Sequence, residues 1–307
     1  MTDQSSNAAV LGGGTMGSDI AAIFVAGGWR VHVVEPKRAR WDALRDRVAA
    51  SVGQLGAVAD RSRLQLYAAN AELPWGEVRL AIECVPESLA LKQSVFAELE
   101  RLARPDAPLA SNSSSFPISE IGRGLATRSR MLGLHFFMPA HLVPCVEVVR
   151  GEATSPAVCE AMSATMRGLG RVPVQVKKDI PGFLANRLQH ALMREAFALI
   201  EQGLASPEDV DNAVRYGFGF RYLAAGPILQ KDLSGLDVHA AAATTMYPTL
   251  ANDEAPPRCL RDRVADGKLG VKTGEGFYKW DPARAAREQA RYERALTAAL
   301  EVLKREV

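Results

Sequence analysis

The feature that most constrains the fold of this chain is a glycine-rich turn near its amino-terminus. Residues Gly12-Gly13-Gly14-Thr15-Met16-Gly17 contain the pattern Gly-x-Gly-x-x-Gly, directly after the apolar run 8–11 and at the start of the helical pattern 15–26. The first glycine permits a sharp bend, the second lets the backbone approach a pyrophosphate, and the third lets the helix pack closely on the strand. Free amides and the helix dipole then attract phosphate groups. The spacing therefore predicts a strand, a tight turn and a helix that bind a dinucleotide.

An acidic residue about twenty positions after this turn supports the same interpretation. Glu35 stands at the end of the second apolar run, 31–34. A carboxylate there accepts hydrogen bonds from the ribose hydroxyls of NAD and repels the additional phosphate of NADP, so NAD is the predicted cofactor. Lys37, Arg38 and Arg40 follow closely, and this basic cluster is the alternative signal, for a cofactor with that phosphate. The residues predicted to bind NAD in this region are Gly12, Gly14, Thr15, Met16, Gly17 and Glu35.

Short apolar runs alternate with helical patterns through the first half of the chain, which is typical of a parallel sheet covered by helices. Runs with strand character lie at 8–11, 31–34, 64–68, 80–84, 108–111, 131–135, 146–149 and 172–176. Helical spacing occurs at 15–26, 89–103 and 156–169. The charged, proline- and glycine-containing segment 177–182 then has the composition of a domain boundary. The predicted architecture is a Rossmann-type doubly wound α/β sheet in residues 1–182, followed by an all-α domain in residues 183–307.

The carboxyl-terminal part of the chain contains only helical patterns. The longest covers residues 183–202 and ends at Gly203. Its apolar residues cover more than one face, so this helix needs burial on several sides. A core shared between two copies of the chain satisfies this need, and so does a central position within one domain; a homodimer through the helical domain is the expected assembly. Ser206-Pro207-Glu208 predicts the start of the next helix, because it supplies an N-cap, a first-turn proline and a first-turn acid.

The composition excludes several classes of function. Hydrophobic residues make up 48% and charged residues 23% of the chain, as in ordinary globular proteins. The 37 basic and 35 acidic residues are mixed along the chain, so we expect neither a nucleic-acid nor a membrane partner. The polar start, residues 1–7, lacks the pattern of a secretory signal. Without the paired spacing of a zinc site, the cysteines predict no metal and indicate reduced thiols in the cytoplasm. They are Cys84, Cys145, Cys159 and Cys259.

Hydride transfer from an alcohol requires a base for the hydroxyl proton, and histidine suits this task because its ordinary pKa lies near neutrality. His135 ends the run 131–135, and ligands bind outside the carboxyl ends of the strands in an open α/β sheet. Glu147 begins the next run twelve positions later, within reach of the histidine if the two strands pair. We therefore predict His135 as the acid–base and Glu147 as its partner. The other histidines lie in a predicted strand, helices or a loop: His32, His141, His190 and His239.

The segment Gly-Leu-His135-Phe-Phe-Met-Pro, followed by Val-Glu147-Val-Val, resembles the 3-hydroxyacyl-CoA dehydrogenase family. The resemblance extends over nearly the whole chain and implies an NAD-dependent enzyme that oxidises a hydroxyl group. Besides the glycine turn, it includes the segments Ala-Ser-Asn112-Ser-Ser114-Ser, Lys-Asp-Ile-Pro-Gly-Phe-Leu-Ala-Asn186-Arg, Ala-Gly-Pro227 and Gly-Lys-Leu-Gly-Val-Lys-Thr-Gly-Glu-Gly-Phe-Tyr278.

The resemblance implies a role for each site residue. It makes His135 the general base in oxidation, and Glu147 the carboxylate that orients its ring and favours its charged form. It implies that Ser114 and Asn186 hold the substrate oxygen and the nearby nicotinamide. Asn186 also stands early in a predicted helix, where the positive end of the dipole favours a developing oxyanion. The resemblance also implies that Glu87, Lys92 and Ser114 occupy positions that approach the cofactor.

One residue departs from the family pattern. Met138 stands where the family usually has asparagine, three residues after the histidine, so a polar contact in the site is lost. Either Met138 leaves more apolar room beside the base, or His141 nearby replaces the missing hydrogen bond. The departure bears on the substrate more than on the reaction.

The family contains enzymes of acyl-CoA thioesters and relatives that act on small free hydroxy acids, such as L-gulonate 3-dehydrogenase (lambda-crystallin) and L-carnitine dehydrogenase. Two segments are more similar to the free-acid relatives. The stretch after the second strand is short and has no lysine between Lys37 and Lys92, although seven arginines remain there for a CoA phosphate. The segment Gly-Phe-Gly-Phe-Arg221-Tyr resembles those relatives, whose arginine suits a carboxylate through bidentate pairing.

We therefore expect oxidation of a small 3-hydroxy acid to the 3-oxo acid, with the substrate bound by Ser114, Asn186 and Arg221. The alternative is a 3-hydroxyacyl-CoA dehydrogenase of fatty acid metabolism, acting for example on 3-hydroxybutyryl-CoA. A protein of another class, which keeps the fold without catalysis, would be free to lose His135 or Glu147. Because these residues are present, the sequence favours an enzyme.

Overall fold

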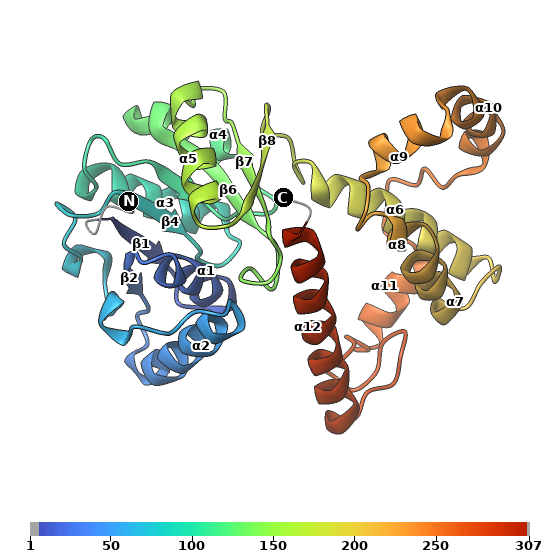
Figure 1. Ribbon diagram of the computed structural model, residues 1–307, viewed down its shortest axis with the longest axis horizontal. Helices are drawn as coiled ribbons and strands as arrows, with labels where there is room; N and C mark the ends of the chain where they lie inside the picture. The colour runs from blue at the N-terminus through green and yellow to red at the C-terminus, as the bar shows by residue number, and fades with distance from the viewer. Residues whose placement is uncertain (1–5, 306–307) are drawn as a thin grey trace. The chain divides into compact units, whose positions relative to one another are not determined.

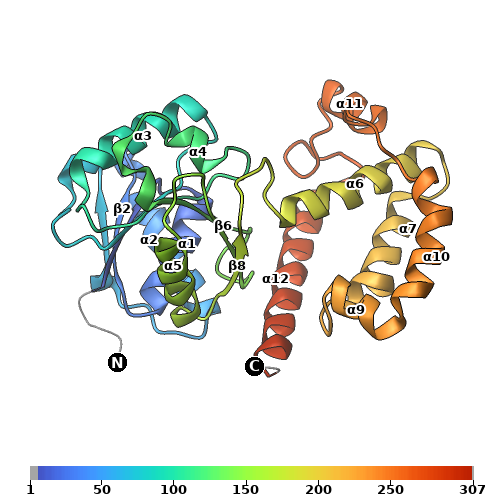
Figure 2. The same ribbon diagram turned by 90° about the horizontal axis from the view of Figure 1, so that it is seen from above.

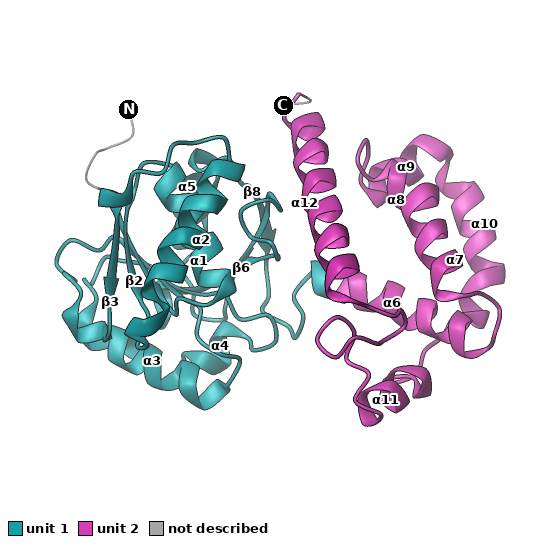
Figure 3. Cartoon of the chain, turned by 90° about the horizontal axis from the view of Figure 1, so that it is seen from below, with its two compact units in different colours: residues 1–186 teal, residues 187–307 magenta. Residues whose placement is uncertain are grey.

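The computed structural model describes residues 6–305; the start of the polar segment, residues 1–5, lies outside this range. The chain divides into two compact units, residues 1–186 and 187–307 (Figure 3). The division falls four residues beyond the boundary at 182/183 that the sequence suggests.

The first unit is built on one eight-stranded sheet with the strand order β3-β2-β1-β4-β5-β6-β7-β8. Neighbouring strands are parallel except for β6 and β7, which pair antiparallel. The order reverses direction at β1, so the switch point of the sheet lies between β1 and β4. The strands are β1 (Asn7–Leu11), β2 (Arg30–Val34), β3 (Leu64–Tyr67), β4 (Leu80–Glu83), β5 (Leu109–Ser111), β6 (Met131–Phe136), β7 (Cys145–Val149) and β8 (Val172–Val176).

Helices cover both faces of this sheet (Figure 2). One face carries α1 (Thr15–Ala26), α2 (Trp41–Gln54) and α5 (Pro156–Gly168), and the other carries α3 (Leu89–Leu102) and α4 (Ile118–Ile121). Along β1, Ala8 and Val10 belong to the first core and Ala9 and Leu11 to the second, since successive side chains point to opposite faces. Burial on both faces explains why the central strands read as unbroken apolar runs. The predicted Rossmann-type doubly wound sheet is confirmed.

The second unit is helical, as predicted (Figure 1). The helix α6 (Ala185–Glu201) begins at the end of the first unit and continues into the second. The other helices are α7 (Pro207–Asn212), α8 (Gly219–Arg221), α9 (Pro227–Ser234), α10 (Leu236–Met246), α11 (Arg258–Ala265) and α12 (Pro282–Lys304). Short 3-10 or π turns occur at Arg38–Arg40, Arg61–Arg63, Asn70–Glu72, Ala126–Arg130, Ala213–Phe218 and Tyr247–Thr249. Within residues 6–305, no helix is long and apolar enough to cross a membrane.

Two helix starts show how the sequence sets element boundaries in this part of the chain. The helix α7 begins as expected: the Ser206 hydroxyl accepts from the N–H of Asp209 at 3.1 Å, and the Asp209 carboxylate accepts from the N–H of Ser206 at 3.4 Å. The helix expected at residues 183–202 begins at Ala185, because Phe183 has a φ of +48°, a left-handed conformation that a right-handed helix does not contain. It is 17 residues long and α12 is 23, so the expectation that it is the longest helix is wrong.

Candidate active site

The glycine turn joins β1 to α1 and has the geometry of a phosphate cradle. Gly12 has a φ of +114°, and a side chain there would lie 2.6 Å from a backbone carbonyl oxygen just after β4. At Gly17 a Cβ would lie 1.8 Å from the Gly12 oxygen, whereas at Gly14 it would meet nothing within 4 Å. No described side chain caps the start of α1, and the side chain of Thr15 there is exposed beside the half-buried Met16. The turn therefore leaves backbone amides accessible to a pyrophosphate.

The carboxylate of Glu35 lies beside this turn, directly after β2. The residue is 5% exposed, and its Oε1 accepts from the N–H of Lys37 at 3.0 Å. Its Oε2 lies 3.6 Å from a guanidinium nitrogen of Arg40, and the side chains of Lys37 and Arg38 are exposed. A carboxylate at the carboxyl end of β2, next to the switch point, is the group that a ribose diol requires.

His135 and Glu147 occupy directly opposed positions on β6 and β7. The Nδ1 of His135 lies 2.8 Å from the Oε2 of Glu147, and the two side chains are 3% and 0% exposed. Because a carboxylate only accepts, Nδ1 carries the hydrogen in the neutral ring, and Nε2 is left as the acceptor. The exposed hydroxyl of Ser114 lies 3.0 Å from that Nε2. The loop that carries Ser114 is also tied to β6, since Asn112 Oδ1 accepts from the N–H of Phe136 at 2.9 Å.

The second oxygen of Glu147 is held by the start of α6. Its Oε1 accepts from the N–H groups of Leu184 at 3.0 Å and Ala185 at 2.8 Å. Burial alone would raise the pKa of Glu147, but the hydrogen bonds from His135, Ala185 and Leu184 outweigh burial and lower that pKa below its ordinary value. Asn186 follows directly as the second residue of α6 and is half-buried. The helix start therefore fixes the carboxylate that orients His135.

Two aromatic rings hold the His135 ring from its sides. The ring centroid of Phe137 lies 4.6 Å away and that of Phe183 lies 5.6 Å away, both in edge-to-face geometry. Phe183 is 3% exposed and occupies the left-handed conformation noted above. A bulky residue in that conformation is strained, and such strain persists only where surrounding contacts maintain it. The contact between Phe183 and the His135 ring is one of these contacts.

A buried ion pair lies behind the Ser114 loop. Glu83, the last residue of β4, is 0% exposed, and Lys92 on α3 is 1% exposed. Lys92 Nζ lies 2.8 Å from Glu83 Oε1 and 3.1 Å from Glu83 Oε2. Glu83 also accepts from the N–H of Val85 at 2.7 Å and from the hydroxyl of Ser111 at 2.6 Å.

Glu87 connects this pair to the Ser114 loop. Its Oε2 lies 3.1 Å from Lys92 Nζ, and its Oε1 accepts from the Ser113 hydroxyl at 2.6 Å and the Ser115 N–H at 3.0 Å. Burial opposes ionisation, but the hydrogen bond from Ser113 and the charge of Lys92 outweigh it and lower the pKa of Glu87. Glu87 therefore lies at the site as a half-exposed carboxylate, while Lys92 directs its N–H groups at protein oxygens.

His141, the expected substitute for the asparagine that Met138 replaces, does not face His135. His141 is buried, with Nδ1 3.3 Å from Asp19 Oδ2 and Nε2 hydrogen-bonded to the Gln54 side chain. These contacts join the loop after β6 to α1 and α2, so the expectation that His141 replaces the lost hydrogen bond is wrong. Met138 itself is 67% exposed.

Arg221 belongs to the second unit, whereas the other candidate residues belong to the first. It is the last residue of α8, and its side chain is exposed. Sequence reasoning missed Glu83, Phe137 and Phe183. The available signal for Glu83 was a charged residue near the end of an otherwise apolar run, and the signal for Phe183 was its place directly after a glycine at the predicted boundary.

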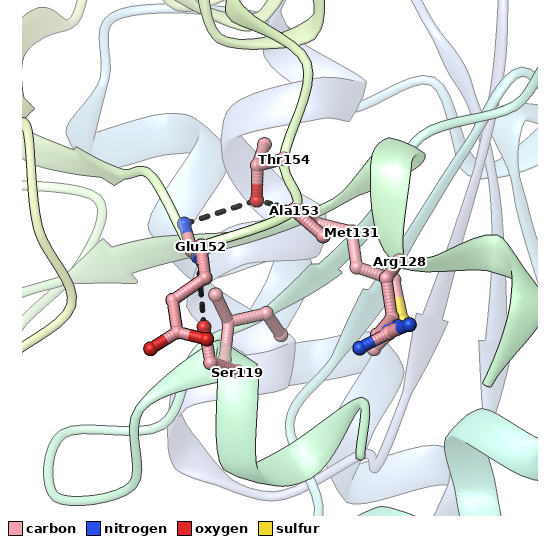
Figure 4. A pocket seen from close by; sticks show the side chains of 8 residues that line it. Ser119, Arg128, Met131, Glu152, Ala153 and Thr154 are labelled. Carbon is pink, nitrogen blue, oxygen red and sulfur yellow. Dashed lines mark hydrogen bonds between the residues drawn. The ribbon is translucent and has the colours of Figure 1, made fainter. Parts of the chain in front are cut away.

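Figure 4 shows a small pocket in the first unit, whose lining includes Met131, the first residue of β6. The pocket therefore lies at the opposite end of this strand from His135. Its volume is about 30 Å³, and its lining includes Ser119, Met131 and Glu152. The Ser119 hydroxyl accepts from the N–H of Glu152 at 2.9 Å. A volume of this size suits a single water molecule. None of the residues that line the pocket is a candidate site residue, so the pocket is separate from the candidate site.

Both parts of the chain match one family. Residues 7–180 match the NAD binding domain of 3-hydroxyacyl-CoA dehydrogenase, and residues 182–280 match its C-terminal domain. The chain is 32% identical to a 5-formyl-3-hydroxy-2-methylpyridine 4-carboxylate 5-dehydrogenase of Mesorhizobium japonicum, over 97% of this chain and 98% of that protein. It is 37% identical to a 3-hydroxybutyryl-CoA dehydrogenase of Mycobacterium tuberculosis, over 91% of this chain and 100% of that protein.

Solved structures of two such proteins are similar to this chain to different degrees. The crystal structure of a 5-formyl-3-hydroxy-2-methylpyridine 4-carboxylic acid 5-dehydrogenase, an NAD+-dependent dismutase, matches with a TM-score of 0.91 at 31% identity, covering 97% of this chain and 98% of that chain. The structure of (S)-3-hydroxybutyryl-CoA dehydrogenase from Ralstonia eutropha matches with a TM-score of 0.72 at 30% identity, covering 90% and 99%.

Proposed function

The chain belongs to the 3-hydroxyacyl-CoA dehydrogenase family of NAD-dependent oxidoreductases, and on this premise we propose that it oxidises the hydroxyl group of a small 3-hydroxy acid to the 3-oxo acid. The observation that carries the proposal is the His135–Glu147 pair with the exposed Ser114 hydroxyl at the free ring nitrogen. This arrangement presents a base to an incoming hydroxyl group from the ligand side of the sheet.

The proposed reaction uses His135 Nε2 as the proton acceptor. The substrate hydroxyl takes a place beside Ser114, whose own hydroxyl lies 3.0 Å from Nε2. When His135 accepts the proton, Glu147 stabilises the resulting imidazolium, and the amides of Leu184 and Ala185 keep that carboxylate in place. In the reverse direction the same nitrogen returns the proton to the substrate oxygen.

Asn186 is proposed to bind the substrate oxygen. It directly follows Ala185, whose N–H binds Glu147 at 2.8 Å, so its side chain starts next to the acid–base pair. Its position in the first turn of α6 adds the positive end of the helix dipole, which favours negative charge developing on that oxygen.

NAD, when bound, supplies the carbon that accepts the hydride. The residues that fit it are the turn at Gly12, Gly14 and Gly17 for the pyrophosphate and Glu35 for the ribose, on the glycine geometry and the buried carboxylate described above. Lys92, with its N–H groups directed at protein oxygens, is proposed to act on the cofactor through Glu87 rather than by direct contact.

A free carboxylic acid is the proposed substrate class. The support is the TM-score of 0.91 with a dehydrogenase whose named substrate carries a carboxylate next to the formyl carbon that is named for oxidation. The helix after β2, 14 residues from Trp41 to Gln54, also contains no lysine that could pair with a CoA phosphate. Arg221 is the proposed partner of the carboxylate, because a guanidinium pairs with it through two parallel hydrogen bonds.

The second candidate is a 3-hydroxyacyl-CoA thioester, as in fatty acid metabolism. It is favoured by the 37% identity to a 3-hydroxybutyryl-CoA dehydrogenase over 100% of that protein. Arginines on and near α2, including the exposed Arg61, offer partners for a CoA phosphate. This candidate uses the same acid–base pair. The two substrates differ in the group on the carboxyl carbon, which is a free carboxylate in one and a CoA thioester in the other.

A substrate screen with NAD tests the proposal. We expect NADH formation, followed by its absorbance, to be faster with a free 3-hydroxy acid than with any 3-hydroxyacyl-CoA. The panel includes an aromatic acid that carries a formyl group, since a relative is named for that chemistry. If 3-hydroxybutyryl-CoA is turned over far better than every free acid, the second candidate takes the place of the first.

We also propose a homodimer formed through the helical unit, in the cytoplasm. Nine large apolar side chains among residues 187–305 are at least 60% exposed, against two among residues 6–186, and such surfaces are typical of protein interfaces. The four cysteines are all free, which is consistent with a reducing compartment. The nine are Leu188, Leu204, Tyr216, Phe220, Ile228, Leu233, Leu236, Val238 and Tyr247.

A further inference from the structure

Glu83, Lys92 and Glu87 form a charge cluster with one net negative charge. Every hydrogen-bond partner of the Glu83 carboxylate is a donor: the Lys92 ammonium, the Val85 N–H and the Ser111 hydroxyl, which itself accepts from the N–H of Ser113 at 3.1 Å. This environment fits an ionised carboxylate, since a protonated one would need an acceptor. Lys92 donates to Glu83, to the Val85 carbonyl oxygen and to Glu87, so one ammonium is shared by two carboxylates.

The charge cluster lies next to the reacting atoms. Glu87 binds the Ser113 hydroxyl and the Ser115 N–H, and Ser114 between them lies 3.0 Å from the Nε2 of His135. Hydride transfer requires van der Waals contact between the nicotinamide carbon and the carbon whose hydroxyl His135 deprotonates. The nicotinamide ring therefore has to lie near this loop, a step that rests on the function proposed above.

We propose that the charge cluster shifts the nucleotide preference of the protein towards the oxidised form. It raises the ratio of the dissociation constant for NADH to that for NAD+. The nicotinamide ring carries one positive charge in NAD+ and none in NADH, while the rest of the two molecules is the same. A net negative charge fixed near the ring therefore attracts NAD+ and leaves NADH largely unaffected. At a separation of about 10 Å and an effective dielectric constant between those of protein surface and water, one unit charge changes the affinity ratio about threefold to tenfold. Glu83 acts here as a specificity residue without touching the cofactor.

A simple structural role for the same residues predicts a different result. If Glu83 and Glu87 only hold the Ser114 loop in place, their loss disturbs the binding of both nucleotides by the same factor. The ratio of the two dissociation constants, Kd for NADH divided by Kd for NAD+, is therefore the informative quantity. It does not depend on turnover or on the identity of the substrate.

The experiment measures both dissociation constants by calorimetry on the full chain, for variants ranked by the net charge of the cluster. Glu87→Gln and Glu83→Gln each bring the net charge to zero, so we expect the ratio to fall about threefold to tenfold in both. The double variant Glu83→Gln with Lys92→Met leaves the charge of Glu87 alone and so restores one net negative charge, and its ratio should return to that of the wild type. Glu152→Gln, at the opposite end of β6, is the control for loss of an acidic side chain and should leave the ratio unchanged.

The outcomes separate this proposal from the proposed function. Equal changes in both affinities, or a double variant that keeps the ratio of Glu83→Gln, would overturn the role of the net charge. If Glu83→Gln does not fold, Glu87→Gln and the double variant still decide, because they differ by one charge. A protein that shows the expected ratios but oxidises no 3-hydroxy compound would contradict the proposed function and leave the charge effect standing.

Discussion

The two units of this chain differ in how they bury their apolar residues. In the first unit, helices on both faces of the sheet enclose two cores, and central residues such as Val10, Ile82 and Leu134 are completely buried. Among residues 187–305 only Ala196 and Leu300 are buried. The second unit also contains a pocket of about 840 Å³ between α6, α7 and α12, whereas the two pockets described for the first unit measure about 30 and 260 Å³.

This difference indicates different sources of stability. Burial of apolar surface stabilises a fold by about 25 cal/mol for each Å² removed from water. The first unit obtains this stabilisation from apolar surface buried between its own sheet and helices. The second unit leaves much of its apolar surface exposed, so its helices depend on another surface, which we propose to be a second copy of the chain. The predictions below test whether chemistry resides in the first unit and association in the second.

The largest expected effect is on chemistry in the first unit. Replacement His135→Ala removes the proton acceptor, so kcat should fall by about 10²–10⁴, while the dissociation constant for NAD changes little. Steady-state kinetics and a nucleotide titration measure the two quantities. Replacement of His190 by alanine, a histidine of the second unit, is the matched control and should leave kcat near that of the wild type. A near-normal kcat in His135→Ala would remove this residue from the mechanism.

The second prediction concerns association through the second unit. Leu188 on α6 is 60% exposed, and Leu188→Glu would bury an unpaired charge in the proposed interface, raising the dimer dissociation constant by about a hundredfold. Sedimentation velocity over a concentration series measures this. Val58, an apolar residue of the first unit that is 95% exposed, provides the control, and Val58→Glu should leave the assembly unchanged. A wild type that stays monomeric throughout the series would contradict the proposed dimer.

The fold of the first unit was largely predictable because its central strands are buried on both faces. Such strands appear in the sequence as apolar runs without alternation, and each of the eight predicted runs overlaps an observed strand. The helix α2 was missed because it is polar overall. Its buried apolar residues, Leu44, Val48 and Val52, do repeat every four positions, but arginines and aspartates around them dilute the pattern.

The candidate site was predictable only where strand register determined it. A histidine at the end of one run and a glutamate at the start of the next become neighbours as soon as the strands pair, as His135 and Glu147 do. The contacts of Glu83 with Ser111, and of His141 with α1 and α2, depend on packing between elements far apart in the sequence, which no local spacing encodes. The left-handed conformation of Phe183 was also not predictable from local sequence, because surrounding contacts maintain it.

The third prediction asks whether the second unit takes part in substrate recognition. A charged hydrogen bond contributes about 1.5–3 kcal/mol, so Arg221→Met should lower kcat/KM for a free 3-hydroxy acid roughly tenfold or more. Arg221→Lys should recover only part of this loss, because a point charge does not reproduce the guanidinium fork. A CoA thioester has no carboxylate at that end, so its kcat/KM should change little. Equal losses for both substrate types would show that Arg221 does not bind the carboxylate.

The smallest expected effect is the pH dependence of the stability of the first unit. The pKa of Glu147 in the folded protein is lowered, against the opposing effect of burial, by hydrogen bonds from His135 and from the start of α6. A carboxyl group with a lowered folded pKa contributes stability that is present above its unfolded value, near 4.5, and is lost as the pH falls through the folded pKa. The free energy of unfolding of the wild type should therefore decrease more steeply below about pH 4.5 than that of Glu147→Gln.

Urea titrations between pH 6 and 3, at intervals of about half a pH unit, provide the measurement. Fluorescence in a Trp280→Phe background reports on the first unit alone, because the remaining tryptophans, Trp29, Trp41 and Trp75, all belong to it. Glu288→Gln is a suitable control in the second unit: its pKa is lowered by an exposed contact with Arg291, where solvent screens the interaction. Glu288→Gln should not change how steeply the free energy of unfolding falls with decreasing pH in the acid range, here called the acid limb. Parallel acid limbs for the wild type and Glu147→Gln would mean that Glu147 orients the histidine without linking the stability of the first unit to pH.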